Sequence, residues 1–169
     1  MKHEESNLQK QCVSWFRAQY PQYAMLLTHP INEGSGHSHR DRIRQAIHKA
    51  EGAVAGVPDL LLFIPSVIYK YYAGCQIGGL YSYNGLGIEF KTKRGRQSQE
   101  QKDFQRMFET AAYRYIVVRS FEEFQNAINE WMRHVDTNIK YEIMNAYQEI
   151  TKAAEQREKE KFYKIIGKK

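Results

Sequence analysis

Cysteine is scarce in this chain of 169 residues. The two present, Cys12 and Cys75, lie far apart in the sequence. A disulfide framework needs several cysteines and a zinc ribbon needs CxxC pairs, so both are disfavoured. Apolar runs are also short, well below the roughly 20 residues that a helix needs to cross a bilayer. The opening MKHEESNLQK is charged and lacks the apolar stretch of a secretory signal, which predicts a cytoplasmic protein.

The composition is that of a basic globular domain. Hydrophobic residues make up 42% of the chain and aromatic residues 13%, including 12 tyrosines. The formal net charge is +6, and the sequence pI is about 9.2. A chain of this size and composition suits one domain with one core. The positive charge favours an anionic partner, with nucleic acid first and an acidic membrane surface second.

Periodic apolar residues divide the chain into alternating helices and strands. Helical spacing is clearest near the start, where Leu8, Cys12 and Phe16 form one stripe. Short β-branched and aromatic runs are typical of strands. These patterns predict helices over 5–20, 40–51, 98–112 and from 120 onward, and strands over 23–27, 56–65, 86–92 and 115–118. Such alternation predicts an α/β fold with a mixed central sheet flanked by helices.

Two segments fall outside this alternation. The stretch SVIYKYYAGCQIGGLYSYNG, over 66–85, is rich in tyrosine and interrupted by glycines, so it forms either a hairpin or an extended lobe. From Asp136 the chain becomes charged and helical, with an apolar stripe that includes Ile139 and Ile143. We therefore expect a main domain over 1–135 and a helical extension over 136–169. The extension packs either on its own domain or on a second copy of the chain.

Charged residues interrupt two strands that otherwise resemble core. GVPDLLLFIP carries Asp59, and GIEFKTKRG carries Glu89 and Lys91. Side chains alternate along a strand, so Glu89 and Lys91 share one face. If the two strands pair, Asp59 joins them within a few ångströms. The alternative is less specific, with a solvated Glu–Lys pair on an exposed strand and Asp59 capping a turn.

Two carboxylates and an amine in one place suit phosphodiester hydrolysis. Adjacent carboxylates repel each other and raise one pKa, and a divalent cation relieves that conflict. Mg²⁺ prefers oxygen ligands and keeps several waters, so one or two carboxylates are enough to bind it. A bound metal lowers the pKa of water and stabilises charge on a phosphate, while a nearby lysine orients or deprotonates the water.

These residues also match a known pattern. Pro58-Asp59 followed by Glu89-Phe90-Lys91 fits the PD…(D/E)xK motif of restriction-endonuclease-like nucleases. The segments HEESNLQKQCVSWFRAQYP, AEGAVAGVPDLLLF, GIEFKTKRGRQSQEQKDF and YIVVRSFEEF together resemble the VRR-NUC family of that superfamily, over roughly Glu5 to Trp131. The resemblance implies a restriction-endonuclease-like core. The chain departs from the family in that Asp59 and Glu89 lie 30 positions apart, a separation that suggests an enlarged hairpin.

The resemblance assigns roles to the central residues. Asp59 and Glu89 would ligate Mg²⁺, with Mn²⁺ as a substitute, and the Phe90 backbone carbonyl would add a third oxygen. Lys91 would position or activate the attacking water.

Two further residues are implied by the same resemblance, and each has a structural alternative. Glu5 fits the family's first-helix glutamate by its spacing to Leu8 and Gln9, with Glu4 as the other candidate. The pattern Ser6-x-x-Gln9 is also a capping box, which would leave Glu5 outside the helix. Gln101 matches a glutamine that lies beside the catalytic lysine, but Ser98-x-x-Gln101 is itself a capping box.

Basic and aromatic residues supply candidate contacts to nucleic acid. Either they grip phosphates or they form solvated surfaces. The candidates at the mouth of the site are Lys93, Arg94 and Arg96, and those on the preceding helix include Arg40 and Arg44. The tyrosines of 68–83 stack on unpaired bases or form core or a dimer surface. His37 and His39 form a His-x-His pair, which is more typical of an exposed loop than of a zinc site.

Taken with the resemblance, these residues predict a Mg²⁺-dependent DNA endonuclease. Stand-alone members of the family resemble structure-selective nucleases that act on branched DNA as homodimers, so Holliday-junction resolution is the first substrate hypothesis. The alternative is a nucleic-acid-binding module that kept the fold without catalysis. Polarity, cut position, the choice of DNA over RNA, and a role in repair, recombination or phage and mobile-element biology stay open.

Overall fold

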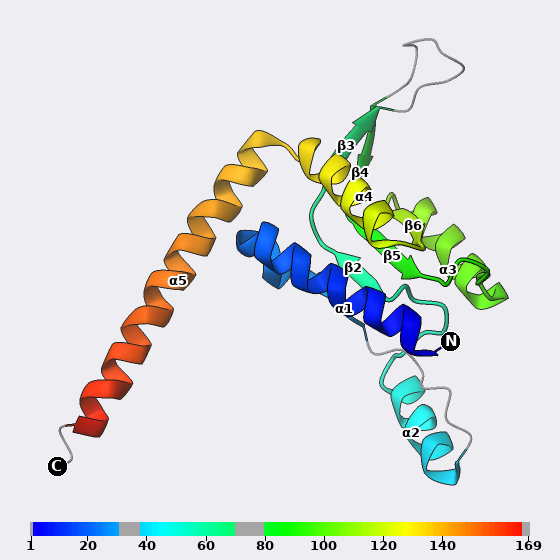
Figure 1. Cartoon of the computed structure of the whole chain (residues 1–169), viewed down its shortest axis with the longest axis horizontal. Helices are drawn as coiled ribbons and strands as arrows, with labels where there is room; N and C mark the ends of the chain where they lie inside the picture. The colour runs from blue at the N-terminus through cyan, green and yellow to red at the C-terminus, as the bar shows by residue number, and fades with distance from the viewer. Residues whose placement is uncertain (1, 31–37, 70–79, 167–169) are drawn as a thin grey trace. The chain divides into compact units, whose positions relative to one another are not determined.

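The computed structural model describes residues 2–30, 38–69 and 80–166 (Figure 1). The chain divides into two compact units, Met1–Val135 and Asp136–Lys169, and each is described by itself. The larger unit holds both sheets and the candidate site. Its helices and strands alternate along the chain, which confirms the predicted α/β class.

A mixed four-stranded sheet forms the centre of the larger unit. The strand order is β1-β2-β5-β6, with β2 antiparallel to both β1 and β5, and β6 parallel to β5. The strands are β1 (Leu27–Thr28), β2 (Leu60–Leu62), β5 (Leu86–Phe90) and β6 (Arg114–Val118). All five residues of β5 are buried. The strand that carries Glu89 therefore lies in the interior, between two partners.

Helices cover the two faces of this sheet. On one face, α1 (Lys2–Gln19) packs on α4 (Phe121–Arg133), and Phe90 of β5 stacks on Phe124 with ring centroids 6.1 Å apart. On the other face lies α3 (Gln99–Thr110), so close that a Cβ added at Gly87 would meet the Phe108 ring at 2.9 Å. Alternation along β5 consequently sends Phe90 toward the apolar layer and Glu89 toward α3.

One predicted strand was wrong. Residues 23–27 were expected to be extended, but Pro21–Leu26 forms the 3-10 helix η1, and only Leu27 and Thr28 pair with β2. Pro21 occupies the first turn, where its missing N–H costs nothing, and the N–H of Tyr23 donates to the Tyr20 carbonyl at 3.0 Å. The buried Tyr23 ring gives this turn its apolar contact.

The strand predicted over 56–65 is also shorter than expected. Only Leu60–Leu62 pairs in the sheet, because Pro58 and Pro65 have no N–H to donate and Gly56 adopts a left-handed φ of 86°. The hairpin alternative for 66–85 is confirmed, since β3 (Ser66–Tyr69) pairs antiparallel with β4 (Leu80–Tyr83). Residues 70–79, with their tyrosines, lie outside the described residues, as does His37.

The remaining helices follow their capping signals. In α2 (His39–Ala50), Ser38 and Asp41 form a capping box, and α5 (Thr137–Ile166) begins where the Asp136 carboxylate accepts the N–H groups of Asn138 and Ile139. None of the helices described is long and apolar enough to cross a membrane.

Trp131 joins α4 to the chain between β2 and β3. Its indole N–H donates to the buried Ile64 carbonyl at 3.1 Å, and its own carbonyl accepts the Ser66 hydroxyl at 3.1 Å.

We expect Trp131→Phe to lower the free energy of unfolding by about 1–3 kcal/mol, because the Ile64 carbonyl loses its hydrogen-bond donor. This loss adds to the one caused by the smaller apolar area of the phenylalanine ring. Trp15→Phe is the control, because Trp15 makes edge-to-face ring contacts and no hydrogen bond from its indole N–H to any residue that the structure describes. Equal losses in urea unfolding of the two variants would contradict this assignment.

Candidate active site

Asp59 and Glu89 lie side by side at the junction of β2 and β5. Leu60 pairs with Ile88 in the antiparallel register, so the next step along both strands brings Asp59 opposite Glu89. One Asp59 carboxylate oxygen accepts the N–H of Phe90 at 2.8 Å. The predicted pairing of the two motif strands is therefore confirmed, and the carboxylates share one site.

Three donors converge on the Glu89 carboxylate, which is only 2% exposed. Its Oε1 accepts from the Lys91 ammonium at 2.6 Å and from the Gln101 amide at 2.5 Å. Its Oε2 accepts from the Tyr115 hydroxyl at 3.3 Å. The Lys91 side chain is itself 13% exposed, so the alternative of a solvated surface pair is wrong.

The two neighbouring carboxyl groups of the site both have raised pKa values. Burial is the main cause that raises the pKa of both Asp59 and Glu89 above their ordinary values. The charge of Asp59 raises the pKa of Glu89 further, while Lys91 acts in the opposite direction on both groups. Burial, followed by the charge of Glu89, also raises the pKa of Tyr115. The single ammonium compensates only part of the negative charge.

Gln101 caps α3 and also contacts the carboxylate site, and its catalytic role stays a prediction. Its carbonyl oxygen accepts the backbone N–H of Ser98 at 2.9 Å, which completes the capping box of α3. Its amide donates to Glu89 from the same side chain. Gly56 brings this first turn close to β2, because a Cβ there would collide with the backbone of Glu100. The start of α3 is thus fixed against the site by packing as well as by hydrogen bonding.

The structure places Glu5 inside α1 and in contact with the site. Because α1 begins at Lys2, the alternative in which Ser6 caps the helix is wrong. The Glu5 carboxylate accepts the N–H of Thr92 at 2.7 Å, just beyond the end of β5. Glu4 is exposed, and together with Glu5 it lines a cavity of about 500 Å³. Geometry brings both glutamates to this edge of the sheet, and a catalytic role for either stays a prediction.

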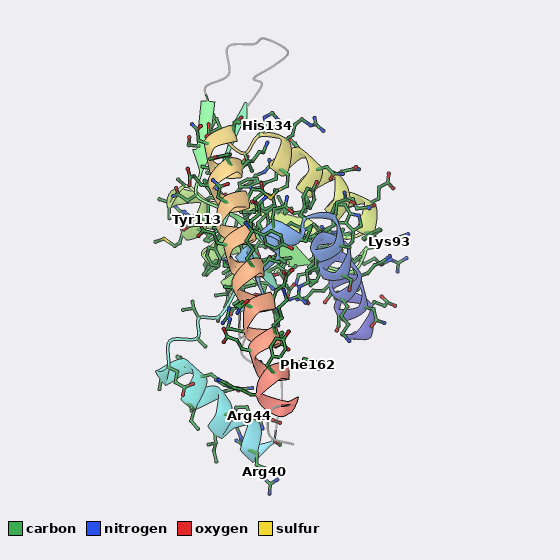
Figure 2. All side chains as sticks on the ribbon, turned by 90° about the vertical axis from the view of Figure 1, so that its left-hand side faces the viewer. Arg40, Arg44, Lys93, Tyr113, His134 and Phe162 are labelled. Atoms are coloured by element: carbon green, nitrogen blue, oxygen red, sulfur yellow. The ribbon has the colours of Figure 1, made fainter. Side chains whose placement is uncertain are left out.

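A cavity of about 500 Å³, called the first cavity, opens beside Lys91. Its lining mixes carboxylate and cationic groups, and consists of Glu4, Glu5, Leu8, Lys91, Thr92, Lys93, Arg94 and Arg119. The predicted contacts Lys93 and Arg94 therefore lie at the site, whereas Arg96 is exposed but does not line the cavity. Figure 2 shows Arg40 and Arg44 on α2, well apart from Lys93. Those two arginines are not brought to the site.

Sequence reasoning missed Arg119, Tyr115 and His29. Arg119 follows β6, and its guanidinium donates to the Gly95 carbonyl at 3.1 Å. The signal was present, because β5 and β6 are parallel and parallel strands end at the same edge of a sheet. The imidazole Nδ1 of His29 lies 2.6 Å from the Asp59 carbonyl, and the Gln9 amide donates to the same oxygen at 3.4 Å. No sequence motif predicts the contact of His29 or that of Gln9 with the Asp59 carbonyl.

The donor set of the site fits a hard divalent cation. Asp59 and Glu89 supply carboxylate oxygens, and the N–H of Phe90 already points at Asp59. The N–H and C=O of one strand residue face the same neighbour, so the Phe90 carbonyl is directed to that side as well. In the part of the chain that the structure describes, no three His, Cys, Asp or Glu side chains gather as a metal cluster. Two carboxylates nevertheless suffice for Mg²⁺.

The sheet, the flanking helices and the carboxylate–lysine site define a domain of the restriction-endonuclease-like class. Residues 3–122 match the VRR-NUC domain, so the chain belongs to the VRR-NUC family and its domain is of nuclease type. A solved structure described as a VRR_NUC domain protein has a similar fold. It aligns with a TM-score of 0.57 and 20% identity, covering 78% of this chain and 90% of that one. Comparison with curated proteins gives no match.

The raised pKa of Asp59 predicts that its charge destabilises the metal-free fold. A carboxyl whose folded pKa is raised contributes most to stability below its ordinary pKa of about 4, and loses that contribution as pH rises through the folded pKa. We therefore expect Asp59→Asn, which keeps an oxygen for the Phe90 N–H, to raise Tm in chelator at pH 7 by about 2–8 °C. The gain should disappear in acid.

Asp41→Asn is the matched control for this experiment. Its hydrogen bonds from Ser38 hold the pKa of Asp41 below the ordinary value, so the same substitution should not raise Tm at pH 7. If Asp59→Asn is neutral or destabilising at pH 7, burial does not raise the pKa of Asp59 as described.

Proposed function

We propose that the protein is a metal-dependent DNA endonuclease that hydrolyses phosphodiester bonds. The observation that carries this proposal is the buried Glu89–Lys91 pair beside Asp59. Buried charges are costly, and a fold retains them readily where they bind or react. Mg²⁺, with Mn²⁺ as a substitute, is the cofactor that the oxygen donors favour.

Each residue of the site has a separate role in the proposed hydrolysis. Asp59, Glu89 and the Phe90 carbonyl would hold the cation, which supplies a more acidic water and stabilises charge on the phosphate. Lys91, which donates to Glu89, would orient the water for attack on phosphorus, while the bond from phosphorus to the leaving oxygen breaks and that oxygen takes up a proton. Gln101 holds the Glu89 carboxylate in one orientation from α3. Lys93 and Arg94 face the first cavity, where they would bind phosphates without reading bases.

A binding module without catalysis is the second candidate. The positive charge of the chain favours it equally, because phosphate binding needs only cations. Two carboxylates at the place where phosphate would bind weaken such a module, since they repel the ligand unless a metal lies between them. The observed donor set therefore favours the enzyme.

Cleavage assays separate the two candidates. We expect the wild-type chain to cut DNA with Mg²⁺ or Mn²⁺ and to be inactive in EDTA. Asp59→Asn and Lys91→Gln should each lower kcat by about 10²- to 10⁴-fold, because they remove a metal ligand and the group that orients the water. Lys91→Gln keeps an amide that can donate to Glu89, so the buried carboxylate is not left without a donor.

The control is Lys152→Gln, which removes one exposed charge from α5. It should cut like the wild-type chain. Cleavage that survives both site variants would contradict the proposed site, and tight binding without cleavage under any metal would support the binding module. A panel of duplex, flap, single-stranded and four-way DNA tests the further proposal that branched DNA such as Holliday junctions is preferred.

We also propose that the chain acts as a homodimer through α5. The helix has 30 residues and an apolar stripe formed by Ile139, Ile143, Tyr147 and Ile150. A helix gains most of its stability from packing such a stripe. Light scattering at micromolar concentration should give twice the chain mass of 19.9 kDa. Ile143→Glu should give the monomer and Gln148→Glu should not, whereas a monomeric wild-type chain would contradict the dimer.

A further inference from the structure

A second cavity of about 380 Å³, called the second cavity, lies on the other flank of α1. The first cavity uses the side of α1 that carries Glu4 and Leu8, at the β5–β6 end of the sheet. The second uses Ser6, Lys10, Ser14 and Arg17, and is closed by Leu27, His29 and Leu60 from the β1–β2 side. Together the two cavities flank the junction at which Asp59 and Glu89 meet.

The chemistry of the second cavity is suited to a polyanion. Its lining has two permanent cations, Lys10 and Arg17, together with hydroxyl and amide groups, but no carboxylate side chain. Neither cation forms a salt bridge with any residue that the structure describes, and both side chains are exposed. Both cations are therefore accessible to an anionic ligand.

Four residues that line the second cavity form a row along α1. Ser6, Lys10, Ser14 and Arg17 follow the spacing i, i+4, i+8 and i+11, so they share one face of α1. From Ser6 to Arg17 the helix rises by about 16 Å (17 − 6 = 11 steps of 1.5 Å). A row of this length is longer than a single phosphate group needs and fits an extended chain of phosphates.

The same cavity connects directly to the site. Gln9 and His29 both line it, and both contact the backbone carbonyl of Asp59, at 3.4 and 2.6 Å. The carboxylate of the same residue accepts the N–H of Phe90 at 2.8 Å. One residue thus separates the second cavity from the carboxylate pair.

We propose that the second cavity binds the sugar–phosphate backbone of the cleaved strand on one side of the scissile phosphate. The first cavity then holds the strand on the other side, through Lys93, Arg94 and Arg119. Lys10 and Arg17 contact phosphates, and the Ser6 and Ser14 hydroxyls donate to phosphate or sugar oxygens. The inference rests on the proposed nuclease function and adds the path that the strand follows across the site.

The test measures the salt dependence of DNA binding. All chains carry Asp59→Asn, so that little DNA is cut during the binding measurement, and one of them also carries Lys10→Ala and Arg17→Ala. Loss of two phosphate contacts should reduce the slope of log K against log salt by about 1.4 on single-stranded DNA and about 1.8 on duplex DNA. The matched control is Lys152→Ala with Lys159→Ala, which removes the same charge from α5 and should leave the slope unchanged.

Cleavage kinetics give the second readout. In the otherwise native chain, Lys10→Ala with Arg17→Ala should raise KM at least tenfold and leave kcat within about twofold, because the contacts hold substrate and transition state alike. If the native chain cuts DNA but the variant keeps its salt slope and KM, the second cavity is not on the path. If the native chain neither binds nor cuts DNA with any metal, the proposed function fails, and this inference fails with it.

Discussion

The buried ion pair between Lys91 and Glu89 is the interaction on which the rest of this structure depends. Taking both charges out of water costs free energy that their attraction repays only in good geometry and with further hydrogen bonds. Glu89 has those bonds from Gln101 and Tyr115, and Lys91 stays attached to the sheet through its N–H to the Val118 carbonyl at 3.0 Å. A second carboxylate, Asp59, is nevertheless placed beside them, and it works against stability.

The two faces of β5 serve different purposes, because one packs in an apolar layer and the other carries the site. Phe90 packs into the aromatic layer formed with Phe124, which fixes the strand. Glu89 points to the opposite face, where the glycines at 56 and 87 let α3 and the chain before β2 come close. The site is therefore held by rigid packing on one side and by helix capping on the other. This is the kind of support that a precise metal and water geometry needs.

Much of this arrangement follows from sequence alone. The period-2 alternation in GIEFK and the acid after Pro58 predict which side chains meet, provided that the two strands pair, and the register confirms that they do. Gln101 and its capping serine are equally visible, because a capping box is a local signal. Local signals failed at residues 21–26, where a proline turn and the buried Tyr23 outweigh strand propensity.

Contacts between distant segments are what the sequence could not supply. His29 and Arg119 reach the site only because β1 and β6 stand at the two sides of β2 and β5, an order that depends on the whole sheet. Arg40 and Arg44 show the same limit. Their charge predicts a second phosphate-contacting face, and the structure places them on α2, apart from Lys93 (Figure 2). A phosphate-binding role for these two arginines stays a prediction. Charge pattern alone identifies a basic helix without locating it.

We propose that Asp59 and Glu89 form one cation site, with Lys91 beside it. The sharpest test is a crystal structure of the wild-type chain grown with Mn²⁺, in which the anomalous signal locates the metal. We expect one strong peak at about 2.0–2.3 Å from an oxygen of each carboxylate and from the Phe90 carbonyl. A peak bound elsewhere, or a site in which Lys91 alone fills the space between the carboxylates at saturating Mn²⁺, would contradict it.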